Sequence, residues 1–132
     1  MALAQAGCVT GGVRTTLRIE GLALLVGTVW LYWHAGFDWR LFALLFLAPD
    51  LSLLGYLAGP RIGALAYNTA HSTDGAIGLG IAGLALNNSW VIAIALIWLA
   101  HVGFDRALGY GLKYVTGFHD THLGRIGRAR EN

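Results

Sequence analysis

The chain has 132 residues, of which 56% are hydrophobic and only 12% are charged. Soluble domains usually carry about a quarter charged residues, so this composition predicts an integral membrane protein built as one bundle. The net charge of +2, without a basic patch interleaved with aromatic residues, argues against a nucleic-acid partner, and the single cysteine, Cys8, excludes a disulfide framework.

Four segments approach the roughly 20 apolar residues that a membrane-spanning helix needs. The connections between them are short, so consecutive helices should run antiparallel and form an up-down bundle. We therefore predict an all-α fold with a cytoplasmic arm at residues 1–17, a four-span membrane bundle at 18–116 and a basic cytoplasmic tail at 117–132. In chain order, the predicted spans are residues 19–37, 39–57, 62–86 and 90–106.

The basic residues lie almost entirely on one side of these spans. Arg40 is the exception, since it falls in the opposite set of loops. Because Lys and Arg collect in cytoplasmic loops, this distribution predicts a multi-pass protein of the cell (inner) membrane with both termini in the cytoplasm. Trp39 and Trp90 lie at the other helix ends, as an outer aromatic belt would. The basic residues on the cytoplasmic side are Arg14, Arg18, Arg61, Lys113, Arg125, Arg128 and Arg130.

Ionisable residues interrupt the apolar segments at similar depths. A helical rise of about 1.5 Å per residue puts Asp50 and His101 about 15–16 Å from the outer surface, and the others at about 18–22 Å. A lone carboxylate in hydrocarbon costs several kcal/mol, so these groups should share a polar centre inside the bundle. Pro49 should loosen the second helix beside Asp50. The residues at these depths are Glu20, Asp50, His71, Asp74, His101 and Asp105.

Carboxylates and imidazoles from different helices are the ingredients of a divalent metal site, which makes zinc or a similar ion the candidate cofactor. Such an ion lowers the pKa of bound water and so supplies a nucleophile. In this interpretation Asp74 and Glu20 are catalytic groups that handle protons, or alternate ligands. The predicted metal ligands are Asp50, His71, His101, Asp105 and, from the C-terminal segment, His122. The predicted substrate-binding residues are Arg106, Lys113, Tyr67 and Asn68.

Four strings carry most of these residues: LAPDLSLLGY at 47–56, YNTAH at 67–71, HVGFDRALGYGLKY at 101–114 and FHDTHLG at 118–124. Their order and spacing resemble a small four-helix membrane family known as domain-of-unknown-function family 4260. The resemblance covers residues 18–128 and implies a short prokaryotic membrane protein without an established activity. It also implies that Asp120 and His122 are better candidates than His119. A looser similarity is to membrane-bound metal-dependent hydrolases, at the level of fold analogy.

The leading hypothesis is a metal-dependent hydrolase that acts on a lipid or another membrane-confined substrate at the cytoplasmic leaflet, with membrane lipids as its partners. One alternative is an ion- or proton-coupled transporter or channel subunit, which would need a homo-oligomer because four short helices rarely enclose a pathway. Another is a non-catalytic accessory protein, in which His101 simply hydrogen-bonds Asp50 and the His119–His122 segment is a solvated turn.

Overall fold

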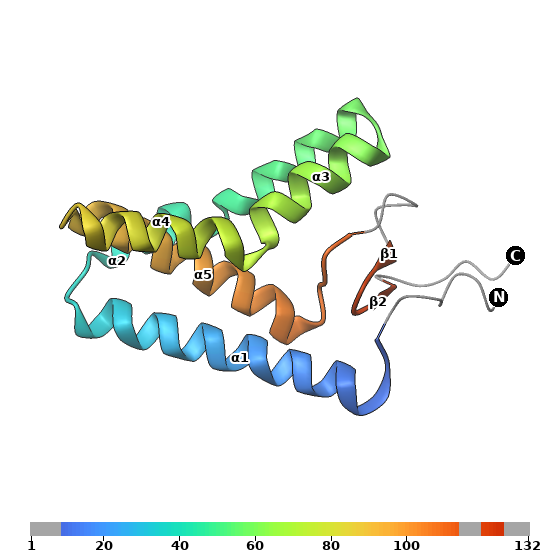
Figure 1. Ribbon diagram of the computed structural model, residues 1–132, viewed down its shortest axis with the longest axis horizontal. Helices are drawn as coiled ribbons and strands as arrows, with labels where there is room; N and C mark the ends of the chain where they lie inside the picture. The colour runs from blue at the N-terminus through green and yellow to red at the C-terminus, as the bar shows by residue number, and fades with distance from the viewer. Residues whose placement is uncertain (1–8, 114–119, 126–132) are drawn as a thin grey trace, which may run out of the picture.

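The computed structural model describes residues 9–113 and 120–125, which form helices joined by short turns and one small hairpin (Figure 1). The predicted helical class is confirmed. In chain order the elements are α1 (Gly11–His34), α2 (Trp39–Leu45), the 3₁₀ helix η2 (Ala48–Ala58), α3 (Pro60–His71), α4 (Thr73–Ala85), α5 (Ser89–Leu108), β1 (Asp120–Thr121) and β2 (Gly124–Arg125). Predictions for residues 1–8, 114–119 and 126–132, including His119, lie outside the described residues.

Helix α5 is central, and α1 and α4 pack along it (Figure 1). The crossing of α1 and α5 is close because glycines stand at the contact. A Cβ atom on Gly103 would lie 2.7 Å from the backbone nitrogen of Leu25 and 2.8 Å from the carbonyl oxygen of Gly21. Small residues at a helix crossing allow such an approach. This contact fixes α5, which carries two of the candidate ligands, against the longest helix.

Helix α1 begins at Gly11, so the last residues of the predicted 1–17 arm belong to this helix. The two basic residues of the first turns are bonded to other parts of the chain. Nε of Arg14 donates to the carbonyl oxygen of Leu123, and Nε of Arg18 donates to that of Ala107 at 3.0 Å. These bonds hold the polar first turns of α1 against the rest of the chain, before the apolar part of the helix begins.

The second predicted span is divided into α2 and η2. Pro49 has no N–H to donate and its ring opposes α-helical continuation, while the Asp50 N–H bonds the Leu47 carbonyl at 3.0 Å in a tighter turn. The expected loosening beside Asp50 is present, but it extends along the whole of η2. Helix α2 is capped at its N-terminus by Asp38, whose carboxylate accepts a hydrogen bond from the Arg40 N–H at 2.8 Å.

The third predicted span, residues 62–86, forms two helices instead of one continuous helix. The chain breaks at Ser72, whose backbone is extended (φ −87°, ψ 157°), between α3 and α4. Helix α3 leaves the layer of α4 and α5 and pairs with η2 as an arm (Figure 1). The break frees helical carbonyl groups, and two of them find donors: Trp98 Nε1 bonds Ala70, and Arg106 bonds His71 at 3.2 Å. The interruption is therefore held by side chains of α5.

Large apolar side chains cover the outside of the structure. Leu51, Leu54 and Leu57 of η2 are 64–87% exposed. Two helical segments of the described chain, Trp39–Ala58 and Ser89–Leu108, are long and apolar enough to cross a membrane. The apolar stretch of the first segment, Trp39–Ala58, is 0% buried, whereas the core helix of a soluble protein would be largely covered. An exposed apolar surface of this extent indicates contact with something other than water.

The hairpin of β1 and β2 closes one end of the bundle. Thr121 pairs with Lys113, and His122 exchanges backbone bonds with Leu112 and Val9 (His122 N to Leu112 O, 3.0 Å; Val9 N to His122 O, 2.8 Å). Leu123 is completely buried. The described part of the predicted tail is thus folded onto the bundle rather than extended away from it.

Candidate metal centre

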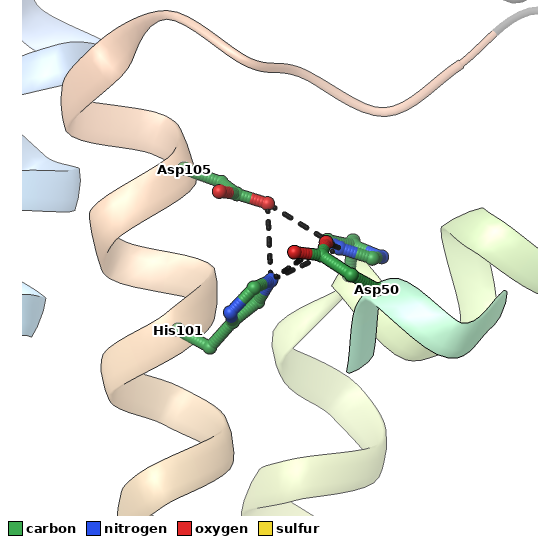
Figure 2. A group of neighbouring side chains, drawn as sticks. Asp50, His101 and Asp105 are labelled. Atoms are coloured by element: carbon green, nitrogen blue, oxygen red, sulfur yellow. Dashed lines mark hydrogen bonds and ion pairs between the residues drawn. The ribbon is translucent and has the colours of Figure 1, made fainter. Parts of the chain in front are cut away.

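Four of the predicted ligands meet in one group although they come from three separate parts of the chain. Asp50 lies on η2, His71 ends α3, and His101 and Asp105 are one turn apart on α5. Each offers one nitrogen or oxygen atom, and these four atoms lie within 4.8 Å of one another. Figure 2 shows Asp50 reaching towards His101 and Asp105 from the facing element. This group has the composition of a divalent metal site, two imidazoles and two carboxylates.

Five distances between the ligand atoms are close to those of a tetrahedral site. Nε2 of His71 lies 3.1 Å from Oδ1 of Asp50 and 3.3 Å from Oδ2 of Asp105. Nε2 of His101 lies 3.2 Å from each of the same oxygens and 3.1 Å from Nε2 of His71. For zinc bonds of about 2.0–2.1 Å, tetrahedral geometry requires ligand atoms about 3.3–3.4 Å apart. These five separations are close to that value, and all four atoms lie within 4.8 Å of one another, so the group could hold a small ion.

His71 is oriented by its own helix. Its Nδ1 lies 2.9 Å from the carbonyl oxygen of Tyr67, one turn earlier, so Nδ1 carries a proton and donates it there. Nε2 is then left as a lone pair directed at the centre, the form that binds a metal. The Tyr67 ring is stacked on the imidazole with centroids 3.7 Å apart and an angle of 9°. Tyr67 thus positions a ligand through both its backbone and its ring.

Three of the four ligand side chains are covered, and the fourth is partly exposed. The side chains of His71, His101 and Asp105 are 3%, 1% and 13% exposed, whereas that of Asp50 is 41% exposed. Phe46 packs edge-on against His101, with ring centroids 5.4 Å apart. A molecule entering the centre would therefore approach beside Asp50, and the other three ligands would remain covered.

Two predicted substrate-binding cations lie next to the centre. Arg106 follows Asp105 and bonds the His71 carbonyl, which places a positive charge at the C-terminus of α3. Lys113 is only 4% exposed, and its Nζ lies over the Tyr67 ring, 4.6 Å from the centroid. Burial lowers the pKa of the Lys113 ammonium to about 8, and the negative charge of Asp105 acts in the opposite direction.

Asn68 has a structural task. Its amide nitrogen donates to the Lys113 carbonyl at 2.8 Å, and its amide oxygen accepts from the Lys113 N–H at 2.6 Å. The side chain thereby joins α3 to the segment after α5, much as a neighbouring strand would. Both ends of the amide are used in this way, so the predicted contact with substrate would have to compete with these bonds.

The structure places three other predicted site residues outside the group. Glu20 is exposed on α1, and Asp74 is exposed in the first turn of α4. Nδ1 of His122 accepts a hydrogen bond from the Leu112 N–H at 2.9 Å. Burial lowers the pKa of the His122 imidazole, and the charge of Arg106 lowers it further. Since Nδ1 is occupied by the backbone, His122 fastens the hairpin to the chain.

One contributor was not anticipated from the sequence. Trp98 bonds the Ala70 carbonyl and lies against Gly75, where a Cβ atom would be 2.7 Å from the indole ring. It thereby holds the break between α3 and α4 that positions His71. A signal was present, because Trp98 precedes His101 by one helical turn and so lies on the same face of α5.

A family model described as "Domain of unknown function (DUF4260)" matches residues 14–126, which include all four grouped ligands, Arg106 and Lys113. The chain belongs to the DUF4260 family. The resemblance carried by the four sequence strings is therefore confirmed. No curated protein and no solved structure matches the chain.

Proposed function

We propose that the protein crosses the cell membrane four times, with both termini in the cytoplasm. Two helices of sufficient length and apolarity support this, together with the basic residues gathered on one side of the predicted spans. Helix α1 has 24 residues, about 36 Å, and α3 and α4 add about 18 and 20 Å in sequence. The break at Ser72 is compatible with a membrane because side chains satisfy the carbonyls around it.

Within this bundle we propose a metal-dependent hydrolase that uses zinc or a similar divalent ion. The observation that carries the proposal is the group of four ligand atoms, in which five separations of 3.1–3.3 Å are close to those of tetrahedral coordination. The three buried residues, His71, His101 and Asp105, would hold the ion. Two histidines with one carboxylate, and a fourth position open to water, form a recurrent catalytic zinc site.

The proposed division of labour follows from exposure. When bound, the ion would supply a water of lowered pKa and polarise the ester. Asp50, the most exposed member, would leave the fourth position and accept the proton as this water adds to the ester. It would return that proton to the oxygen that leaves when the ester bond breaks. Asp50 thus takes the role that the sequence suggested for Asp74 and Glu20, because those two side chains lie outside the group.

The proposed substrate is a lipid or another membrane-confined ester with an anionic group. Arg106 and Lys113 lie next to the centre and supply positive charge. The transporter alternative is disfavoured because the surroundings of the centre along α5 are apolar, with Ile94, Ile97 and Trp98 before His101. Ions moving outward through the bundle would meet few polar groups there.

The first test is the metal content of the protein purified in detergent, measured by elemental mass spectrometry. We expect close to one divalent ion per chain, lost in His71→Ala and His101→Ala. His34→Ala is the matched control, because His34 is exposed and stacked on Trp30 away from the centre. Wild-type protein that stays free of metal after reconstitution with zinc, manganese or iron would overturn the hydrolase and leave a hydrogen-bonded polar core.

A further inference from the structure

An apolar cleft is lined by residues that adjoin two of the candidate metal ligands along the chain. It has a volume of about 210 Å³ and is formed where α2 and η2 meet α3 and α5. Its walls adjoin the ligands in sequence: Pro49 precedes Asp50, and Ala70 precedes His71. The lining residues are Leu45, Ala48, Pro49, Ala70, Ile94, Ile97 and Trp98.

The cleft offers almost no hydrogen-bonding group. The only polar side-chain atom of its lining residues is the Trp98 indole nitrogen, which already donates to the Ala70 carbonyl. A polar guest would lose its bonds to water here without replacement, whereas a hydrocarbon chain would lose nothing. The chemistry of the walls therefore selects an aliphatic chain.

The features along α5 follow one another in a definite order. Ile94 and Trp98 line the cleft, His101 and Asp105 belong to the metal centre, and Arg106 adds positive charge beyond it. Ile94 and His101 are seven residues apart, about 10 Å along the helix axis. From the N-terminus to the C-terminus of α5, the surroundings are therefore first apolar, then those of the metal ligands, then positively charged. An amphiphile with an acyl chain, an ester and an anionic head group has the same order.

We propose that this cleft binds one acyl chain of an anionic glycerophospholipid and thereby sets its ester beside Asp50. The inference rests on the proposed function and adds its substrate class. Pro49 lines the cleft and precedes Asp50, the most exposed ligand, so a chain lying in the cleft would bring the adjoining ester to the open side of the centre. The head group would then lie towards Arg106.

The test is photo-crosslinking in nanodiscs that contain phosphatidylglycerol with a diazirine in one acyl chain. Labelled peptides are identified by mass spectrometry, and excess unlabelled phosphatidylglycerol or free fatty acid is used as competitor. We expect saturable labelling concentrated on Leu45, Ile94 and Trp98, displaced by phosphatidylglycerol more effectively than by fatty acid. Displacement by fatty acid alone, or labelling spread evenly over exposed leucines such as Leu31 and Leu84, would overturn the proposal.

Two variants make the result specific. Ala48→Phe fills the cleft from an exposed position, and Ala82→Phe makes the same change on the exposed surface of α4, outside the cleft lining. We expect Ala48→Phe to reduce cleft labelling about tenfold, the loss expected when two methylene groups leave an apolar site. Ala82→Phe should leave it unchanged. Equal labelling of both variants and the wild type would contradict the binding of an acyl chain in the cleft.

The measurement separates this inference from the proposed function. Crosslinking reports lipid contact whether or not metal is bound, and metal content reports the centre whether or not lipid is present. Cleft labelling without metal would retain the lipid site and reject the hydrolase. Metal without cleft labelling would retain the centre and reject the acyl-chain site.

Discussion

Nε2 of His71 lies 3.1 Å from Nε2 of His101, and both atoms face the same two carboxylate oxygens. His71 uses its Nδ1 proton on the Tyr67 carbonyl, so its Nε2 is an acceptor. A single proton on His101 can satisfy only part of a group that contains two carboxylates and a second imidazole lone pair. In the proposed function, a divalent cation would neutralise both carboxylates and engage both lone pairs, and so would satisfy the whole group.

The first prediction concerns the two carboxylates, which differ in exposure. Asp105→Asn should weaken metal binding strongly, because it removes a covered anionic ligand. Asp50→Asn should retain most of the metal but lower lipid hydrolysis by about 10²–10⁴, the range for loss of a general base. Metal titration and turnover measured on both variants check this. Equal loss of metal in the two variants would contradict the separate role of Asp50.

The second prediction concerns stabilisation by metal. Zinc at about 100 times its dissociation constant should stabilise the folded protein by about 2.7 kcal/mol, since binding is linked to folding. The thermal midpoint in detergent should rise accordingly and fall again with a chelator. His71→Ala should abolish the shift, whereas His34→Ala should preserve it. A shift that survives His71→Ala would place the binding site elsewhere.

The four ligands could be predicted because each is an ionisable side chain in an apolar segment, and burying such a group is costly enough to force a shared centre. Their distances from the helix ends gave comparable depths. Depth does not determine which way a side chain points, however. Asp74 follows His71 by three residues and would lie on the same face of one continuous helix, but the break at Ser72 redirects α4 so that Asp74 is exposed.

That break could not be read from composition because it depends on contacts across the fold. Polar residues run from His71 to Asp74 at the break, but the carbonyls freed there are satisfied by Trp98 and Arg106, which lie far along the chain. His122 shows the same limit. A histidine near an aspartate has the composition of a ligand, but the Leu112 N–H occupies its Nδ1, and this bond exists only in the folded hairpin.

The third prediction concerns the stack of Tyr67 on His71. Tyr67→Leu should lower the free energy of unfolding by about 0.5–1.5 kcal/mol beyond the effect of lost area, because the ring contact is removed. It should also weaken metal binding about 10–100-fold, as loss of a group that orients a ligand does. Tyr67→Phe keeps the ring and should behave like the wild type. Similar behaviour of Leu and Phe would show that the ring does not position His71.

The fourth prediction is a rise in stability with pH. Burial lowers the folded-state pKa of Lys113 from 10.5 to about 8, so between these values the unfolded chain binds more protons than the folded one. The penalty for burying the charge is complete below pH 8 and disappears as the pH rises to 10.5. The gain is at most about 3 kcal/mol. Chemical denaturation across this range should show the increase in the wild type and not in Lys113→Met, whereas an equal slope in both would assign it to other groups.

The fifth prediction concerns the attachment of the C-terminal hairpin. Asn68 satisfies both backbone groups of Lys113, so Asn68→Ala leaves a buried donor and acceptor, each at a cost of about 1–3 kcal/mol. The segment that carries Thr121 should then open more often. Hydrogen exchange should accelerate at Lys113 and His122 but not in the centre of α5. Asn68→Asp supplies the control, because its carboxylate still accepts from the Lys113 N–H while the donor to the carbonyl is lost, so its exchange rates should be intermediate. Uniform acceleration over the whole chain would instead mean that Asn68 stabilises the entire fold, and unchanged rates would mean that the hairpin is held without it.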